Sequence, residues 1–123
     1  MRCPFCILEE EKVIERNELA LMFYDNYPVT KHHTLIIPKR HVADYFDLTK
    51  EEVDAMQELL HYQKEKLIDM DSSISGFNIG INVGEDAGQS IFHVHMHLIP
   101  RRYGDMKEPK GGVRGVIPEK QKY

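Results

Sequence analysis

The segment that decides the fold is His93-Val94-His95-Met96-His97-Leu98-Ile99, in which three histidines alternate with apolar residues. Side chains on a β-strand point to opposite faces in turn, so residues two apart lie about 6.5 Å from each other on one face. The three histidines are therefore expected on one face of a strand. The apolar residues from Phe92 to Leu98 are expected on the other face, packed beneath a helix. Three imidazoles in strict alternation favour a functional site over three separate core histidines.

The triplet alone leaves two kinds of site open. A three-histidine metal centre, of the kind found in carbonic anhydrase, needs all three rings to converge on one ion, which neighbours on a strand can do in part. Alternatively, one imidazole acts as a nucleophile. A histidine with an ordinary pKa near 6.5 is mostly unprotonated at about pH 7 and can attack an electrophile.

Outward from this segment, short apolar runs alternate with turn residues and prolines, which is typical of strands joined by tight connections. Gly76 and the glycines of residues 84–88 mark two of the turns. The predicted strands are residues 19–24, 33–37, 77–83 and 91–99, with a further strand or hairpin around Val13 and Leu19.

Thr49-Lys50-Glu51-Glu52 is a capping box, in which Thr49 caps a helix and Glu52 reaches back to it. Apolar residues then recur on one helical face, which predicts a helix to about Met70. Short connections favour antiparallel pairing of the strands. The fold class is therefore α+β, a mainly antiparallel sheet with one long helix on a face. A chain of 123 residues suits one domain over 1–123, with a core of about 13–101 and a loop-like tail of 102–123.

Composition and charge exclude several classes of protein. The chain is 41% hydrophobic and 29% charged, with a net charge of -4, as in ordinary soluble proteins. The tail from Arg101 carries seven basic and three acidic residues, so the first hundred positions hold a net charge of about -8. Such an acidic body argues against nucleic-acid binding. With no apolar run of about 20 residues and no apolar stretch after Met1 that would form a signal peptide, we expect no membrane association and a cytoplasmic location.

Cys3 and Cys6 are the only two cysteines, and two residues separate them. In a cytoplasmic protein this spacing indicates metal binding or redox chemistry rather than a structural disulfide.

The pattern as a whole resembles the histidine triad superfamily, whose motif is His-φ-His-φ-His-φ-φ with φ apolar. The resemblance also covers residues 25–28, 33–41 and 82–90, which follow in the order of the family and nearly fill the span from Leu19 to Arg101. The similarity is greatest to bacterial hydrolases of the fragile-histidine-triad or diadenosine polyphosphate hydrolase type, and residues 111–118 resemble a tail segment of some members. The implied fold is HIT-like.

The resemblance implies cleavage of a purine nucleotide at its α-phosphorus through a covalent nucleotidyl-histidine, with release of a nucleoside monophosphate. Dinucleoside polyphosphates and nucleoside phosphoramidates are the two leading substrate classes. His95 is the implied nucleophile, and the chemistry needs no metal. The implied catalytic partners are His97, Gln89 and His33, and the implied substrate-binding residues are Asp25 for the ribose, Asn82, Gln89, Ser90 and His97. A nucleotidyltransferase or phosphorylase, with phosphate or a sugar phosphate as acceptor, and a non-catalytic nucleotide-binding module remain alternatives.

The resemblance also implies a metal site and an assembly. Cys3, Cys6, His41 and His93 match the ligands of a closed structural zinc site in bacterial members, which would make His93 structural rather than catalytic. Members of the superfamily are typically homodimers whose sheets join across a two-fold axis. Arg114 in the tail is interpreted either as a contact to phosphate or to a dimer partner, or as part of an ordinary loop.

Overall fold

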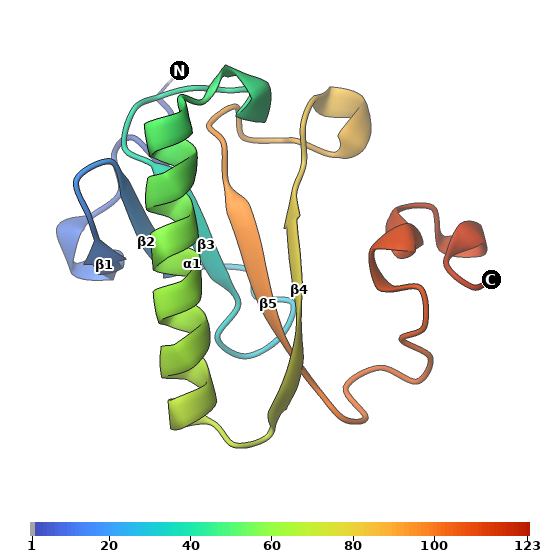
Figure 1. Cartoon of the computed structure of the whole chain (residues 1–123). Helices are drawn as coiled ribbons and strands as arrows, with labels where there is room; N and C mark the ends of the chain where they lie inside the picture. The colour runs from blue at the N-terminus through green and yellow to red at the C-terminus, as the bar shows by residue number, and fades with distance from the viewer. Residues whose placement is uncertain (1) are drawn as a thin grey trace.

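Five strands form one antiparallel sheet, and a single long helix covers one of its faces (Figure 1). The structure is a computed structural model that describes residues 2–123. Its main elements are β1 (Val13–Arg16), β2 (Ala20–Tyr24), β3 (Thr34–Pro38), α1 (Lys50–Met70), β4 (Ile74–Ile81) and β5 (Met96–Arg102). The predicted α+β class, the antiparallel sheet and the strand near Val13 are all confirmed.

The order of the strands in the sheet is β1-β2-β3-β5-β4. After β3 the chain crosses the sheet through α1 to reach β4 at the far edge, and β5 then returns between β3 and β4. The strand that carries His97 is therefore an interior strand, with neighbours on both sides. A central strand is the most rigid place from which to hold functional side chains.

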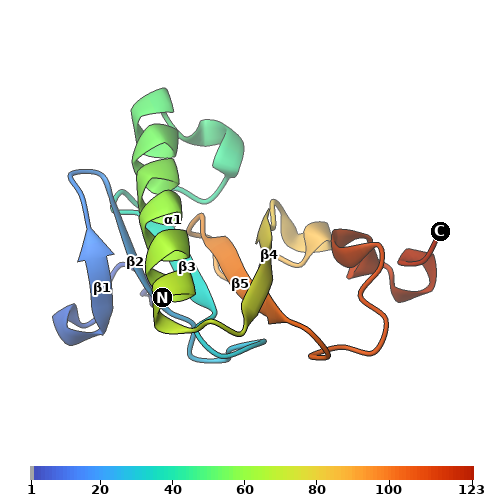
Figure 2. The ribbon, with the colours of Figure 1, turned by 60° about the horizontal axis from the view of Figure 1, so that its bottom comes forward.

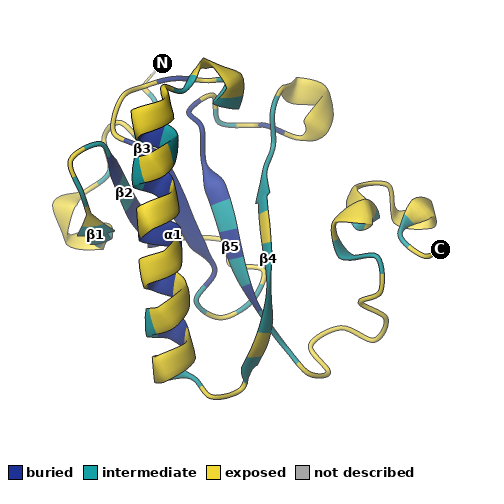
Figure 3. Ribbon diagram, in the orientation of Figure 1, coloured by how far each residue is buried: buried dark blue, intermediate teal, exposed yellow. Residues whose placement is uncertain are grey.

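Alternation along β5 gives the sheet two different faces. Val94, Met96 and Leu98 are buried in the core that packs beneath α1, as predicted. The buried side of α1 comprises Glu52, Met56, Leu59, Leu60, Gln63 and Leu67, and the opposite side of the helix is exposed (Figure 3). A second, smaller core of Phe23, Leu35 and Ile37 lies apart from the helix.

The histidine strand begins and ends later than predicted. β5 starts at Met96, so that His97 alone of the three histidines is within it, and Phe92 is 49% exposed instead of packed under the helix. Before Met96 the chain bends, and the amide of Val94 donates to the carbonyl of Val42 at 2.8 Å. Val94 thus bonds to the loop after β3 and not to a neighbouring strand, and Phe92 lies outside the sheet.

Pro100 lies within β5, whereas the predicted strand stops at residue 99. The pairs that β5 makes with β3 reach only to Leu98, so the missing amide hydrogen of Pro100 costs no ladder bond on that side. The carbonyl of Pro100 instead accepts from the Thr30 hydroxyl at 2.6 Å. The other boundaries shift by a few residues, with β4 at Ile74–Ile81 instead of residues 77–83.

The tail beyond β5 extends beside β4, far from β1 (Figure 2). It was predicted as loop, and it contains two short 3-10 turns, Gly112–Val116 and Pro118–Lys120. Gly111 has φ 91°, and a Cβ there would lie 1.8 Å from the carbonyl oxygen of Gln121, so only glycine fits. In the part of the chain that the structure describes, no helix is long and apolar enough to span a membrane.

The capping box of α1 is tied to the loop after β3, and this gives a first prediction. Glu52 is 4% exposed and accepts two hydrogen bonds from Arg40, at 2.8 and 2.9 Å, and one from the amide of Thr49. The bonds from Arg40 lower the pKa of Glu52 to about 2. Glu52→Gln should therefore lower the free energy of unfolding by about 2 kcal/mol at pH 7, because charge-assisted bonds are lost.

The sign of the pH dependence follows from the lowered pKa. The carboxylate stabilises the fold above its ordinary pKa, and this contribution disappears as the pH falls toward 2. The difference between wild type and Glu52→Gln in urea unfolding should therefore shrink below about pH 4.5. Asp54→Asn, which breaks the exposed pair with Lys50, serves as the control and should cost less than about 1 kcal/mol. A difference that stays constant down to pH 3 contradicts the assignment.

Candidate functional site

A pocket of about 470 Å³ lies on the sheet face that turns away from α1. Phe5, Phe23 and Leu35 give it an apolar wall. Five of the predicted site residues are also part of its lining, and these are Asp25, Asn82, Ser90, His95 and His97. The sequence did not reveal the apolar wall, because Phe5 lies ninety residues from His95 and the cysteines on either side of it signal a metal site and not a pocket. An apolar wall beside converging polar groups is typical of a small-molecule site.

The ring of His95 is held in one tautomer. Its Nδ1 lies 2.9 Å from the carbonyl oxygen of His93, which can only accept, so Nδ1 carries the hydrogen. The lone pair of His95 is therefore on Nε2. The ring is 8% exposed and packs edge-on against Phe5, with centroids 5.1 Å apart. This geometry prepares one nitrogen for nucleophilic attack.

His33 and His97 form a directed pair behind the pocket. The amide of Val29 donates to His33 Nδ1 at 3.0 Å, so the hydrogen of His33 is on Nε2. That Nε2–H donates to Nδ1 of His97 at 2.9 Å. The remaining nitrogen of His97, Nε2, must then carry a hydrogen. His33 does not line the pocket and acts by fixing His97, which does.

The electrostatics keep this pair neutral. Burial, together with His95 and His33, lowers the pKa of His97 to about 4, while Asp25 opposes the change. Burial also lowers the pKa of His33, again against Asp25. Near pH 7 the pocket therefore offers a neutral N–H donor on His97, and the ring centroid of His97 lies 5.2 Å from that of His95.

Asp25 has its two carboxylate oxygens directed differently. One accepts from the amide of Tyr27 at 2.9 Å, as in an ordinary turn, and the other lies 3.6 Å from Nε2 of His33. The side chain is 16% exposed and lines the pocket, so it remains accessible to a ligand.

Gln89 is turned into the protein and does not line the pocket. Its amide nitrogen donates to the carbonyls of Ala43 and Ile91, and its oxygen accepts from the amide of Gly84. Gln89 thus ties the loop that carries Ser90. These three bonds hold the loop in place, and a direct contact of Gln89 with phosphate stays a prediction.

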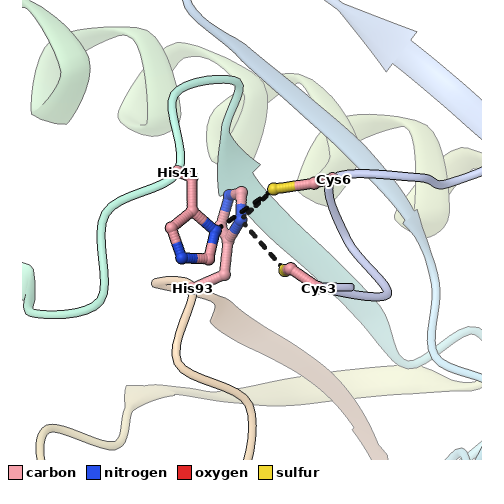
Figure 4. Close-up of side chains that lie close together, drawn as sticks. All are labelled: Cys3, Cys6, His41 and His93. Carbon is pink, nitrogen blue, oxygen red and sulfur yellow. Dashed lines mark hydrogen bonds between the residues drawn. The ribbon is translucent and has the colours of Figure 1, made fainter. Parts of the chain in front are cut away.

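Cys3, Cys6, His41 and His93 converge beside this pocket, and their ligand atoms all lie within 4.8 Å of one another (Figure 4). Three separate segments supply them, namely the N-terminal segment, the loop after β3 and the bend before β5. The Nδ1 atoms of His41 and His93 lie 3.1 and 3.6 Å from Sγ of Cys6. Nε2 of His93 donates to the Pro38 carbonyl at 2.8 Å, which leaves its Nδ1 lone pair toward the sulfurs. Two thiolates and two imidazoles are a ligand set of structural zinc.

The geometry disfavours the alternative of a three-histidine metal centre. The ring of His93 turns to the cysteines, whereas His95 turns to the pocket. Asp25, His33 and His97 also lie close together, but Nε2 of His33 and Nδ1 of His97 bond to each other. Neither of those nitrogens is free to bind a metal.

Comparison with known proteins agrees with the geometry. The family model described as HIT domain matches residues 8–104. The chain is 40% identical over 107 residues to Protein hit of Bacillus subtilis, covering 83% of this chain and 72% of that protein. It is 37% identical to the asymmetrical bis(5'-nucleosyl)-tetraphosphatase of Schizosaccharomyces pombe, over 79% of this chain and 53% of that protein, so it spans about half of this relative.

Solved structures show the same fold. The crystal structure of a Zn-bound histidine triad family protein from Mycobacterium smegmatis superposes with a TM-score of 0.78 at 35% identity, covering 88% of this chain and 81% of that one. With the family model over most of the chain and the three histidines in place, this protein belongs to the HIT, or histidine triad, family.

Proposed function

We propose that this protein is a nucleotide hydrolase that cleaves at the α-phosphorus and releases a nucleoside monophosphate. The observation that carries the proposal is that Nδ1 of His95 donates to the His93 carbonyl, which leaves the lone pair on Nε2 in a pocket that also contains His97, whose Nε2 carries a hydrogen. A poised nucleophile next to a hydrogen-bond donor for a phosphoryl oxygen is the arrangement that covalent catalysis of phosphoryl transfer needs.

The reaction takes two balanced steps. In the first, Nε2 of His95 forms a bond to phosphorus, the bond to the leaving group breaks with its electron pair, and the leaving group takes a proton from solvent. In the second, water attacks phosphorus, the P–N bond to His95 breaks, and the proton of the water returns to solvent. His97 stabilises the phosphoryl oxygens by hydrogen bonding throughout. Ser90 lines the pocket, which supports a proposed contact to the phosphate or the leaving group.

The proposed substrates are purine nucleotides joined to a leaving group at the α-phosphate. The aromatic wall of Phe5 and Phe23 suits a flat base, and Asn82, which also lines the pocket, suits the ribose or phosphate. Dinucleoside polyphosphates and nucleoside phosphoramidates are the leading classes. The name of the S. pombe relative, a bis(5'-nucleosyl)-tetraphosphatase, supports the first of them.

One turnover panel tests the proposal. Diadenosine polyphosphates, adenosine phosphoramidates and nucleoside diphosphate sugars are each incubated with the protein, and the products are identified. Release of a nucleoside monophosphate supports hydrolysis. Formation of a nucleoside diphosphate only when inorganic phosphate is added makes the protein a phosphorylase instead. Binding of these compounds without any turnover shows that the protein is a non-catalytic nucleotide-binding module.

Asp25 gives the next prediction. If the free oxygen of this carboxylate accepts hydrogen bonds from the ribose hydroxyls, Asp25→Ala should weaken binding of adenosine monophosphate about tenfold or more, because such bonds to a charged group contribute about 1.5–3 kcal/mol. The loss should be several times smaller for the 2'-deoxy analogue. Calorimetric titration of both ligands measures this. Equal losses for both would assign Asp25 to the turn alone.

We also propose that the Cys3, Cys6, His41 and His93 cluster holds a structural zinc ion, which ties the N-terminal segment to the bend before β5. The donor set and the Zn-bound relative from M. smegmatis support this. Finally, we propose a homodimer. β4 is an edge strand, so its unpaired backbone N–H and C=O groups can pair with the same strand of a second copy.

A further inference from the structure

Gln63 is a polar residue in the middle of the apolar side of α1. It is fully buried, and its neighbours on that side of the helix, Leu59, Leu60 and Leu67, belong to the main core. Its Nε2 donates to the hydroxyl of Thr34 at 3.0 Å, but its Oε1 is buried without a hydrogen-bond partner. A buried amide with one unpartnered end lowers stability, and an apolar side chain of similar size avoids that cost. Packing of the core therefore does not explain the glutamine.

Thr34 connects Gln63 to the segment that carries His33. The Thr34 hydroxyl accepts from Gln63 and donates to the carbonyl of His32 at 2.9 Å. Thr34 is fully buried, and its partner in β5 is Leu98, so it lies on the helix side of the sheet. Because the hydroxyl oxygen is occupied by the donor from Gln63, the hydroxyl hydrogen is directed to His32. A hydrogen-bonded link thus runs from the helix to the peptide bond immediately before His33.

His32, at the other end of this link, has a backbone conformation that is rare for a residue with a side chain. Its φ is 73°, in the left-handed region, which is strained for residues other than glycine. Nδ1 of its ring is also buried without a partner. Within residues 2–123, His32 and Gln63 hold the two buried side-chain atoms of this kind. Strain and unpartnered buried groups are unfavourable and call for an explanation, which is often a functional one.

His32 lies in the turn between β2 and β3, which sets the tautomer of His33. The amide of His33 closes this turn by donating to the carbonyl of Thr30 at 3.1 Å. The amide of Val29 donates to Nδ1 of His33 and leaves the hydrogen of His33 on Nε2. That hydrogen is donated to Nδ1 of His97, which fixes the hydrogen of His97 on its own Nε2. A shift of the His32 carbonyl moves the turn, and His97 is then no longer restricted to one tautomer.

We propose that Gln63 is a positioning residue for the pair of His33 and His97. It acts from the helix side of the sheet, through the Thr34 hydroxyl and the His32 carbonyl. This inference rests on the proposed hydrolase function, in which His97 donates a hydrogen bond to the phosphoryl oxygens. Gln63 itself lies outside the pocket, on the buried side of α1, and touches no reacting group.

The first test is the tautomer of His97 in Gln63→Met, a variant that keeps the size of the side chain and removes the amide. A long-range proton–nitrogen NMR spectrum distinguishes a ring nitrogen that carries a hydrogen from one that does not, and His97→Gln identifies the signals. In wild type we expect a protonated Nε2 and a bare Nδ1. In Gln63→Met the two signals should move toward each other, because the ring then exchanges between tautomers. The melting temperature should be equal to that of wild type or higher, because an unpartnered buried oxygen is removed.

Turnover is the second test, measured with diadenosine tetraphosphate and with adenosine 5'-phosphoramidate. The kcat of Gln63→Met should fall about tenfold, because a small displacement of a positioned group is enough for such a loss. A larger loss is not expected, because Thr30 also ties the turn to the Pro100 carbonyl. KM should change by less than about threefold, since the aromatic wall is untouched. A lower kcat without a lower melting temperature is what separates positioning from packing.

Two positions supply the control variants. Leu67→Met changes a fully buried residue one turn further along the same side of α1. It should leave the tautomer of His97 fixed and kcat within about twofold of wild type. Thr34→Val removes the middle of the link and should reproduce the loss of kcat, whereas Thr34→Ser keeps the hydroxyl and should keep at least about half of the wild-type kcat. The double variant Gln63→Met/Thr34→Val should lose no more kcat than Thr34→Val alone, because both changes interrupt one link.

Other outcomes are distinguishable. Either a His97 tautomer that stays fixed or a wild-type kcat in Gln63→Met overturns the positioning role and leaves the hydrolase proposal intact. Parallel losses of kcat and melting temperature in Gln63→Met and Leu67→Met make Gln63 an ordinary core residue and overturn it as well. If the wild-type protein cleaves neither compound, the hydrolase proposal itself fails. The tautomer of His97 then decides alone whether Gln63 positions the histidine pair.

Discussion

His95→Ala should abolish turnover, with kcat falling by at least about a thousandfold. Loss of a nucleophile that forms a covalent intermediate usually costs far more than loss of a binding contact. The fold should be retained, because the ring makes one hydrogen bond, to the neighbouring His93 carbonyl, and packs on Phe5 at the pocket surface. Nucleotide binding should also be largely retained, since Asp25, Asn82 and the aromatic wall are untouched.

The turnover measurement is accompanied by a control variant and by direct detection of the covalent intermediate. His61→Ala, on the exposed side of α1, should have wild-type activity and shows that removing a histidine is not harmful in itself. Rapid acid quench and mass spectrometry should find a nucleotidyl adduct on wild-type protein and none on His95→Ala. If His95→Ala keeps more than about a hundredth of the wild-type activity, the role assigned to His95 is wrong.

Much of this site could be predicted from the sequence, because the alternation of the three histidines with apolar residues depends only on neighbouring positions in the chain. Phe5 packs edge-on against both His93 and His95, and His95 packs against His97. The three rings therefore lie on one side of the chain, as the spacing predicted. The same spacing could not show that the strand begins only at Met96, because that depends on a hydrogen bond from Val94 to a loop fifty residues earlier.

The role of Gln89 shows a different limit of sequence patterns. The family resemblance implies that Gln89 is both a catalytic and a substrate-binding residue. In the structure its amide nitrogen donates to the carbonyls of residues 43 and 91, and its oxygen accepts from the amide of residue 84. The residue type shows that a side chain can donate hydrogen bonds. Only the path of the loop decides whether that side chain points into the pocket or toward the main chain beneath it. Tautomers are likewise visible only once the carbonyl of His93 and the amide of Val29 are in place.

Removing the proposed zinc should lower the melting temperature by about 10 °C or more. The four ligands come from three segments far apart in the sequence, and among the described residues the N-terminal segment has few other ties to the sheet, chiefly Phe5 and Leu8 on the smaller core. Metal binding to a site that forms only in the folded state adds directly to stability. Chelation, Cys3→Ser and Cys6→Ser should all produce this loss, and metal analysis should find about one zinc per chain before chelation.

Activity is what separates this structural site from a catalytic metal. A four-ligand site has no open position for substrate, and His95 contributes none of the ligands. Turnover below the melting temperature should therefore survive chelation, with a modest decrease because the His93 carbonyl that orients His95 is held less firmly. If the wild-type protein contains no metal and the two serine variants melt at the wild-type temperature, both cysteines are ordinary thiols and the zinc site is wrong. Turnover that requires added zinc while the fold stays intact would instead support a three-histidine metal centre. The covalent mechanism on His95 would then be wrong.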